Sequence, residues 1–286
     1  AILDGDLHFQ NLKNLSYDLN FDAEKFQALN TNSSHNSIYY GEGYISGLVN
    51  LQGNTSTNLL GIDASLNTEE NTIINLPINS SKEQKKTKFI TFASKKDVDV
   101  PKEMEEYKVD LSGIDMNFDL DITPQAETRL IFNPELGDMI KANGRGSLNM
   151  EVNQNGNFRI FGEYIIEEGD YMFTLKNVIN KNFEIQQGSR IVWNGDPQDA
   201  DINITAVYNL RTSLDNLFLD TTSNYQKRIP VECKVHLREK LNSPDISFEI
   251  DLPTANESTK ARVKSVLTSE EEMNKQFLSL LVLNTF

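Results

Sequence analysis

Hydrophobic and polar residues alternate with a period of two along most of the chain up to residue 252. Successive side chains on a β-strand point to opposite faces of the sheet, so each alternating segment has one apolar and one polar face. Strands buried on both faces would instead be continuous apolar runs. The pattern predicts a mainly β protein with a sheet that is apolar on one face. The clearest segments are 15–21, 114–122, 201–208, 231–237 and 246–252.

The apolar positions of these segments are the candidate lining of a groove. If the strands are neighbours, their apolar sets share one face only in the correct register, because a one-residue slip moves every side chain to the other face. A closed core is the alternative: there a charge at Ile204 unfolds the domain, whereas in an open trough it stays hydrated. The candidate lining residues are Ile114, Met116, Phe118, Leu120, Ile202, Ile204, Ala206, Tyr208, Val231, Val235, Leu237, Ile246, Phe248 and Ile250.

Short turn sequences separate the predicted strands at 153–157, 167–170, 187–189 and 194–197. Gly and Asn supply the positive φ that tight hairpins need, so an antiparallel-dominated meander is expected. No segment long enough for a helix lies between these strands, which disfavours βαβ units.

Two breaks interrupt the alternation. The stretches 80–88 and 95–108 are rich in Lys, Glu and Asp and are predicted to be long exposed excursions. Beyond 256, caps at Asn256 and Ser269 and a stripe that includes Phe277 predict amphipathic helix. The breaks divide the chain into an N-terminal sheet segment (1–95), a polar excursion (96–110), a C-terminal sheet segment (111–256) and a helical cap (257–286), which can all form one domain.

Charge and composition exclude several classes of function. The chain has 42 acidic against 27 basic residues, a net charge of −15, which argues against nucleic acid as a partner because phosphate binding depends on Lys and Arg. The nearly apolar run 277–283 is far shorter than the roughly 20 residues of a membrane-spanning helix. A transmembrane barrel would need alternation up to Phe286, but residues 280–283 are continuously apolar. Without an initiator Met or signal peptide, the chain is interpreted as a fragment of a longer protein.

Candidate chemistry is sparse. Cys233 is the only cysteine and lies on an apolar face, as a small buried hydrophobe would. His236 lies on the polar face of its strand and is expected to be exposed. The acidic clusters at 167–170 and 270–272 have structural explanations in a turn and a helix N-terminus. No nucleotide, zinc-protease or hydrolase motif is present. We therefore predict no catalytic residues, no metal site, no cofactor and no enzyme activity.

From residue 156 to 208 a series of short motifs appears in a particular order and spacing. Together with two later motifs, it resembles the conserved C-terminal domain of the TamB family. The resemblance covers most of the chain, and the inserts at 80–88 and 95–108 and the helix near 257–266 depart from the shorter family pattern. The motifs are Gly162-x-Tyr164, GDYMFTL (169–175), NFEI (182–185), GSRIVWNGDP (188–197), ADINITAVY (200–208), SPDISF (243–248) and LLVLNTF (280–286).

The resemblance implies more than the residues alone show. TamB relatives are anchored in the inner membrane, cross the periplasm and meet a TamA-type outer-membrane barrel protein. Their sheet curls into an open, taco-like apolar trough, as in AsmA-like and bridge-like lipid-transfer proteins. The implied function is to carry phospholipid acyl chains in this groove towards the outer membrane and to support outer-membrane biogenesis. The implied partners are phospholipid, the TamA-type protein and client outer-membrane proteins, and the implied location is the periplasm.

Two other classes of function stay open. A chaperone-like module that assists insertion of outer-membrane β-barrel proteins would expose a strand edge able to accept another strand. A structural extracellular β protein of the solenoid type would have a filled core and an internal repeat of fixed length, and no such repeat is found. The lipid conduit has a physical rationale, because each acyl methylene buried in an apolar groove contributes roughly 0.8 kcal/mol.

Overall fold

The structure is a computed structural model that describes residues 1–11, 14–35, 39–56, 59–78, 113–134, 136–175, 179–197, 199–218 and 227–286. The predicted polar stretches 80–88 and 95–108 lie outside these ranges.

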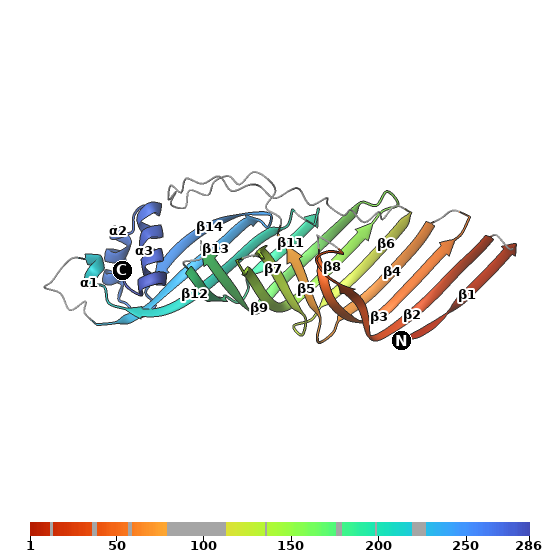
Figure 1. Cartoon of the computed structure of the whole chain (residues 1–286), viewed down its shortest axis with the longest axis horizontal. Coiled ribbons are helices and arrows are strands. Elements are labelled where there is room, and N and C mark those ends of the chain that lie inside the picture. The colour runs from red at the N-terminus through yellow and green to blue at the C-terminus, as the bar shows by residue number, and fades with distance from the viewer. Residues whose placement is uncertain are drawn as a thin grey trace.

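One large sheet forms most of the described chain, as the alternation predicted, and helices follow at its C-terminal end (Figure 1). Its 14 strands follow the order β1-β2-β3-β4-β6-β8-β9-β10-β12-β13-β14, with β5, β7 and β11 joined beside this path. The elements are β1 (Ile2–Asn11), β2 (Asn14–Thr31), β3 (Tyr40–Asn54), β4 (Leu59–Thr68), β5 (Ile73–Pro77), β6 (Ile114–Ile122), β7 (Glu127–Asn133), β8 (Asp138–Val152), β9 (Phe158–Leu175), β10 (Ile179–Ile185), β11 (Arg190–Gly195), β12 (Asp201–Thr212), α1 (Asp215–Phe218), β13 (Ile229–Lys240), β14 (Ser243–Asp251), α2 (Glu257–Val266) and α3 (Glu270–Leu283).

The strand pairs are antiparallel except for β4 with β6 and β5 with β7, which are parallel. Parallel neighbours need a long connection, because the chain must return to the end at which it started. Here β5 ends at Pro77 and β6 begins at Ile114, so the sequence between them is long enough for this return.

Two of the predicted hairpin turns do not reverse the chain. Residues 167–170 lie inside β9, which runs unbroken from Phe158 to Leu175. A Cβ at Gly169 would lie 2.5 Å from the Lys141 carbonyl oxygen, so this glycine permits close strand approach rather than a turn. Likewise, the chain does not reverse at residues 187–189. β10 and β11 run in the same direction on either side of them, because both pair antiparallel with β9.

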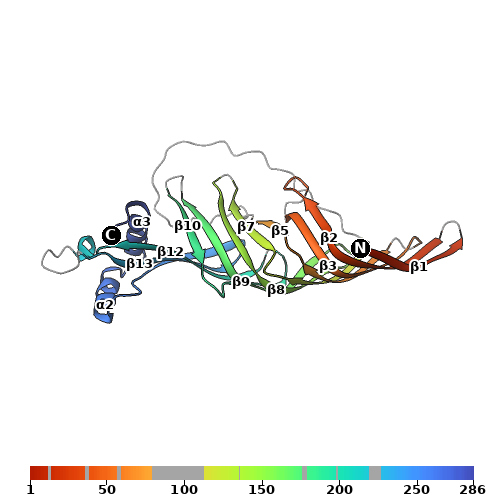
Figure 2. The same cartoon turned by 90° about the horizontal axis from the view of Figure 1, so that it is seen from below.

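These interruptions belong to a row that crosses the sheet, which we call the crease. The register places the extra or unpaired residues of neighbouring strands opposite one another. Bulges bend a strand and increase its twist, so a row of them folds the sheet along a line. Figure 2 shows β5, β7 and β10 rising from the rest of the sheet on one side of this line. The crease comprises 24–25 in β2, 69–72 between β4 and β5, 123–126 between β6 and β7, Glu167 in β9, and 186–189 between β10 and β11.

Hydroxyl groups replace the backbone ladder at the crease. Thr72 Oγ1 both accepts from the Tyr44 amide and donates to the Tyr44 carbonyl, at 3.0 Å each. Thr68 Oγ1 accepts from the Thr123 amide at 2.8 Å, and Thr123 Oγ1 donates to the Thr68 carbonyl at 2.9 Å. Farther along, Ser189 Oγ accepts from the Thr205 amide at 3.1 Å. Thr68, Thr72 and Ser189 are all buried, so these bonds satisfy backbone groups that water does not reach.

The predicted helices and their caps are present. Asn256 caps α2 by accepting from the Thr259 amide at 2.8 Å, and Ser269 caps α3 by accepting from the Glu272 amide at 3.1 Å. The stripe of α3 points inward, because Phe277, Leu280 and Leu281 are fully buried. Both helices lie at the C-terminal end of the sheet, opposite the end formed by β1 (Figure 1).

The apolar face as candidate functional site

The register brings the predicted apolar sets onto one continuous face. Ile204 of β12 is opposite Leu237 of β13, which is opposite Ile246 of β14. On β6, Met116 is opposite Ile62 of β4 and Val152 of β8. The same phase continues through β3 and β2 to β1. We call this surface, together with the inner side of β5, β7 and β10, the apolar face.

Exposure of the apolar face falls steeply from β1 to β12 and β13, and Ile246 and Phe248 on the last strand, β14, are half-buried. On β1, Leu3 and Phe9 are 61% and 70% exposed. On β6 the predicted lining residues Ile114, Met116, Phe118 and Leu120 are half-buried. On β12 and β13, Ile202, Ile204, Ala206, Val231, Val235 and Leu237 are buried, and Ile204 has no exposed surface. The face is therefore open in its N-terminal half and closed in its C-terminal half.

Aromatic side chains and α3 fill the closed half. The Phe277 ring of α3 stacks on Phe248 of β14, with ring centroids 4.3 Å apart, and faces Phe183 of β10 at 6.3 Å. Phe183 in turn lies 6.4 Å from Tyr171 of β9. The buried cluster joins these rings to the predicted lining residues of β12–β14, with Tyr208, Ile246 and Phe248 packed at its margin and Ile250 within it. In this half, the apolar face is therefore a closed core, which is the alternative to an open trough.

The sequence did not single out the residues that rise on the far side of the crease. Leu130 of β7, Ile140 of β8, and Tyr171 and Phe183 belong to the same buried cluster as Ile204. Alternation is present in these strands, but only the crease folds them over the rest of the face. A pattern of hydrophobic positions predicts on which face of the sheet a side chain lies, but it does not predict how the sheet bends.

The opposite face is polar and is bonded by amide side chains. Asn149 Nδ2 on β8 donates to Asn117 Oδ1 and Asp119 Oδ1 on β6, both at 2.9 Å. Asn50 Nδ2 on β3 makes the same bridge to Asp18 Oδ1 and Asn20 Oδ1 on β2, at 2.7 and 2.9 Å. Such ladders stabilise strand pairing while water reaches the side chains. The two faces of the sheet are thus chemically distinct over both halves.

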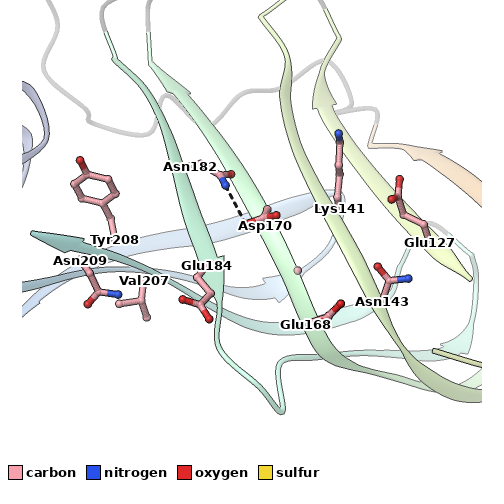
Figure 3. A pocket seen from close by; sticks show the side chains of 11 residues that line it. Glu127, Lys141, Asn143, Glu168, Asp170, Asn182, Glu184, Val207, Tyr208 and Asn209 are labelled. Atoms are coloured by element: carbon pink, nitrogen blue, oxygen red, sulfur yellow. Dashed lines mark hydrogen bonds between the residues drawn. The ribbon is translucent and has the colours of Figure 1, made fainter. Parts of the chain in front are cut away.

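A hollow of about 630 Å³ lies on this polar side, across β7–β10 and β12 (Figure 3). Glu127, Glu168, Asp170 and Glu184 line it together with Lys141. Asn182 Nδ2 donates to Asp170 Oδ1 at 2.9 Å across its floor (Figure 3). The lining side chains occupy exposed and half-buried strand positions, and the apolar face contributes Tyr208 at its edge.

Titratable groups near the apolar face are few. Burial raises the pKa of the Asp138 carboxyl to about 6, and a hydrogen bond with Tyr171 partly opposes this shift. Burial also raises the pKa of the Cys233 thiol to about 12, as befits the predicted small hydrophobe. His236 was expected to be exposed, but its side chain is only 13% exposed. It is held between Thr205 Oγ1 at 3.1 Å and Glu249 Oε2 at 2.9 Å, because neighbouring strands shield this position.

Within the described ranges, no group of three or more His, Cys, Asp or Glu side chains is placed to hold a metal ion. In the same ranges, none of the helices has the length and hydrophobicity to cross a membrane.

A long sheet of mostly antiparallel strands, apolar on one face and folded along a line, defines the class of curved, trough-forming β proteins. The family model for the TamB C-terminal domain matches residues 1–286, the whole chain, so the chain belongs to this family. A search of curated proteins gave no match. Membership of the family gives the chain a TamB-like role in outer-membrane assembly, as part of the cell envelope.

Proposed function

We propose that the apolar face carries phospholipid acyl chains, and that the chain serves outer-membrane assembly in the periplasm by this means, without catalytic turnover. The observation that supports the proposal most is the continuous apolar register from β1 to β8, which gathers half-buried and exposed hydrophobic side chains on one face, whereas Ile2 and Leu48 are isolated exposed hydrophobic residues on the other. Monomeric soluble proteins rarely expose such a large contiguous apolar surface without a ligand or partner for it.

The polar face supports the same proposal. Its carboxylates and amides are hydrated or bonded to one another, and its exposed hydrophobic residues Ile2 and Leu48 are separated by Asp22 in the strand register. Acyl chains would occupy only the apolar side, and their headgroups would stay in water above it. The sheet then acts as a one-sided surface along which chains slide without a polar group to hold them.

A substitution on the open half tests the proposal. We expect Met116→Asp to remain folded, because this side chain is half-buried and a carboxylate there keeps part of its hydration. The same charge breaks the apolar path. Mass spectrometry of the lipids that co-purify with the chain should therefore find phospholipid on the unmodified protein and a large loss on Met116→Asp.

The matched control is Asn117→Asp, which adds the same charge one residue away on the exposed, polar face. It should retain the lipid. Equal loss from both variants, or no phospholipid on the unmodified protein, would contradict the proposal.

A second candidate function, assistance to outer-membrane β-barrel proteins together with a TamA-type partner, is favoured by one observation. In the described sheet β1 pairs only with β2, so its other edge is unpaired, and Ile2 and Phe9 on it are 70% exposed. An edge of this kind can accept a strand from another chain. Protection of the β1 amides from hydrogen exchange on adding an unfolded barrel protein, but not on adding phospholipid vesicles, would favour this function.

A further inference from the structure

We infer that α3 is a displaceable stopper: it closes the C-terminal half of the apolar face, and acyl chains reach that half only when the helix leaves. This inference rests on the proposed function and adds how the site is regulated. Three observations support it: α3 contacts both sides of the folded sheet, its contact with the sheet is apolar, and the apolar face continues beneath it.

The position of α3 is that of a bridge across the folded sheet. Its contacts with the strands are mainly to β14, at one end of the strand order, and to β10, which rises beyond the crease. Phe277 reaches both, through its stack on Phe248 and its contact with Phe183. The helix thus spans the space between the two sides at the end of the molecule farthest from β1 (Figure 1).

The contact between α3 and the sheet is apolar. Phe277, Leu280 and Leu281 have no exposed surface. The hydrogen bonds of the α3 side chains stay within the C-terminal segment, where Gln276 Nε2 donates to Glu272 and Ser279 Oγ donates to the Thr285 carbonyl. Beyond the helix, Thr285 Oγ1 accepts an exposed hydrogen bond from Asn216 Nδ2 of α1 at 2.9 Å. Apolar contact is not directional, so acyl methylenes can take its place without leaving polar groups unpaired.

Gln276 Oε1 of α3 is buried and has no hydrogen-bond partner among the described protein atoms. A buried oxygen that lacks a partner costs free energy, which release of the helix into water would recover.

Beneath α3 the apolar face continues in unbroken register. The pairs that join β12, β13 and β14 place Ala206, Val235 and Phe248 in the same phase as the exposed positions near β1. The chain leaves β14 at Asp251 and reaches α3 through α2, so α3 can swing away without breaking a strand pair. Its departure would extend the open face to the C-terminal end of the sheet.

A photo-reactive benzoylphenylalanine at Phe248 tests the inference, because one probe reports both states. Without lipid it should crosslink to α3, on which Phe248 stacks. With vesicles of phosphatidylethanolamine and phosphatidylglycerol, it should also form a lipid adduct. In Leu280→Ala, which weakens the buried side of α3, that adduct should increase roughly tenfold or more. Leu283→Ala is the matched control, because Leu283 is exposed on the same helix, and it should leave the yield unchanged.

The same probe at Phe118, on the half-buried strand β6, separates the inference from the proposed function. Lipid adducts at 118 with none at 248 in any of the three proteins would show that α3 is a fixed cap and overturn the inference alone. Loss of the α3 crosslink in Leu280→Ala without gain of a lipid adduct would do the same. Absence of lipid at both positions would remove the proposed function, and the inference with it.

Discussion

The hydroxyl oxygens of Thr68 and Thr123 lie 3.2 Å apart where β4 and β6 both end, and they join two parallel strands at the crease. Each of these residues also bonds to the backbone of the other. These side-chain hydrogen bonds therefore replace the backbone hydrogen bonds between strands that the bulges interrupt. Because the two residues lie on adjacent strands, we infer that their side chains help to hold the bend of the sheet.

Removing one hydroxyl should destabilise the protein. Thr68→Val preserves shape but leaves the Thr123 amide without its acceptor at a buried site, which should lower the free energy of unfolding by about 1–3 kcal/mol. Urea denaturation measures this difference. Thr254→Val, at an exposed turn position, is the control and should stay within about 0.5 kcal/mol. A crease variant as stable as this control would show that the hydroxyl bonds do not hold the bend.

A charge should have different effects in the two halves of the apolar face. Ile204→Asp buries an unpaired carboxylate where no surface is exposed, and should cost several kcal/mol, enough to unfold much of the population. Met116→Asp should cost clearly less, because its position on β6 is half-buried. Circular dichroism and urea midpoints compare the two variants. Equal destabilisation would mean that the N-terminal half is as closed as the C-terminal half.

Asp138 should make stability depend on pH. Its pKa is raised from 3.8 to about 6 in the folded protein, chiefly by burial. Between these values the folded state holds a proton that the unfolded state has lost, so the free energy of unfolding falls as pH rises from about 4 to about 6. Asp138→Asn should flatten this slope and be more stable than the unmodified protein at pH 7. An unchanged slope in the variant would assign the pH dependence to other groups.

Removing the N-terminal cap of α3 should weaken the packing of this helix against the sheet. Phe277, Leu280 and Leu281 hold α3 against the sheet, and each of them gains about 1.5–3 kcal/mol by burial. Ser269→Ala removes the bond to the Glu272 amide and should destabilise α3 by about 1 kcal/mol. Hydrogen exchange of the α3 amides should accelerate, while that of β13 should not. Equal acceleration in both would show that helix and sheet open together.

Alternation predicted the strands and the face of each residue, because a period of two is a local property of the chain. It placed Ile204, Leu237 and Ile246 on one side, and the register agrees. Caps likewise predicted both helices from Asn256 and Ser269. Features that depend on one neighbouring residue or on side-chain phase could thus be predicted from sequence alone.

The bend of the sheet could not be predicted in the same way. Gly188 has a φ of +87°, which suits both a hairpin turn and a bulge, and only the partner strand decides whether the chain reverses. Nor could the sequence show that Phe277 would meet Phe248 and Phe183, since those contacts join elements distant in the chain. The division of the apolar face into an open and a closed half follows from these long-range contacts.

The most direct test of the central claim compares the two faces of one strand. Benzoylphenylalanine is placed at Phe118, on the apolar face of β6, and in a second protein at Asp119, the next residue, on the exposed polar face. Both proteins are irradiated with vesicles of phosphatidylethanolamine and phosphatidylglycerol, and the adducts are identified by mass spectrometry. A one-sided lipid trough predicts phospholipid adducts from position 118 and few or none from position 119. Equal labelling from both positions, or none from position 118, would contradict it.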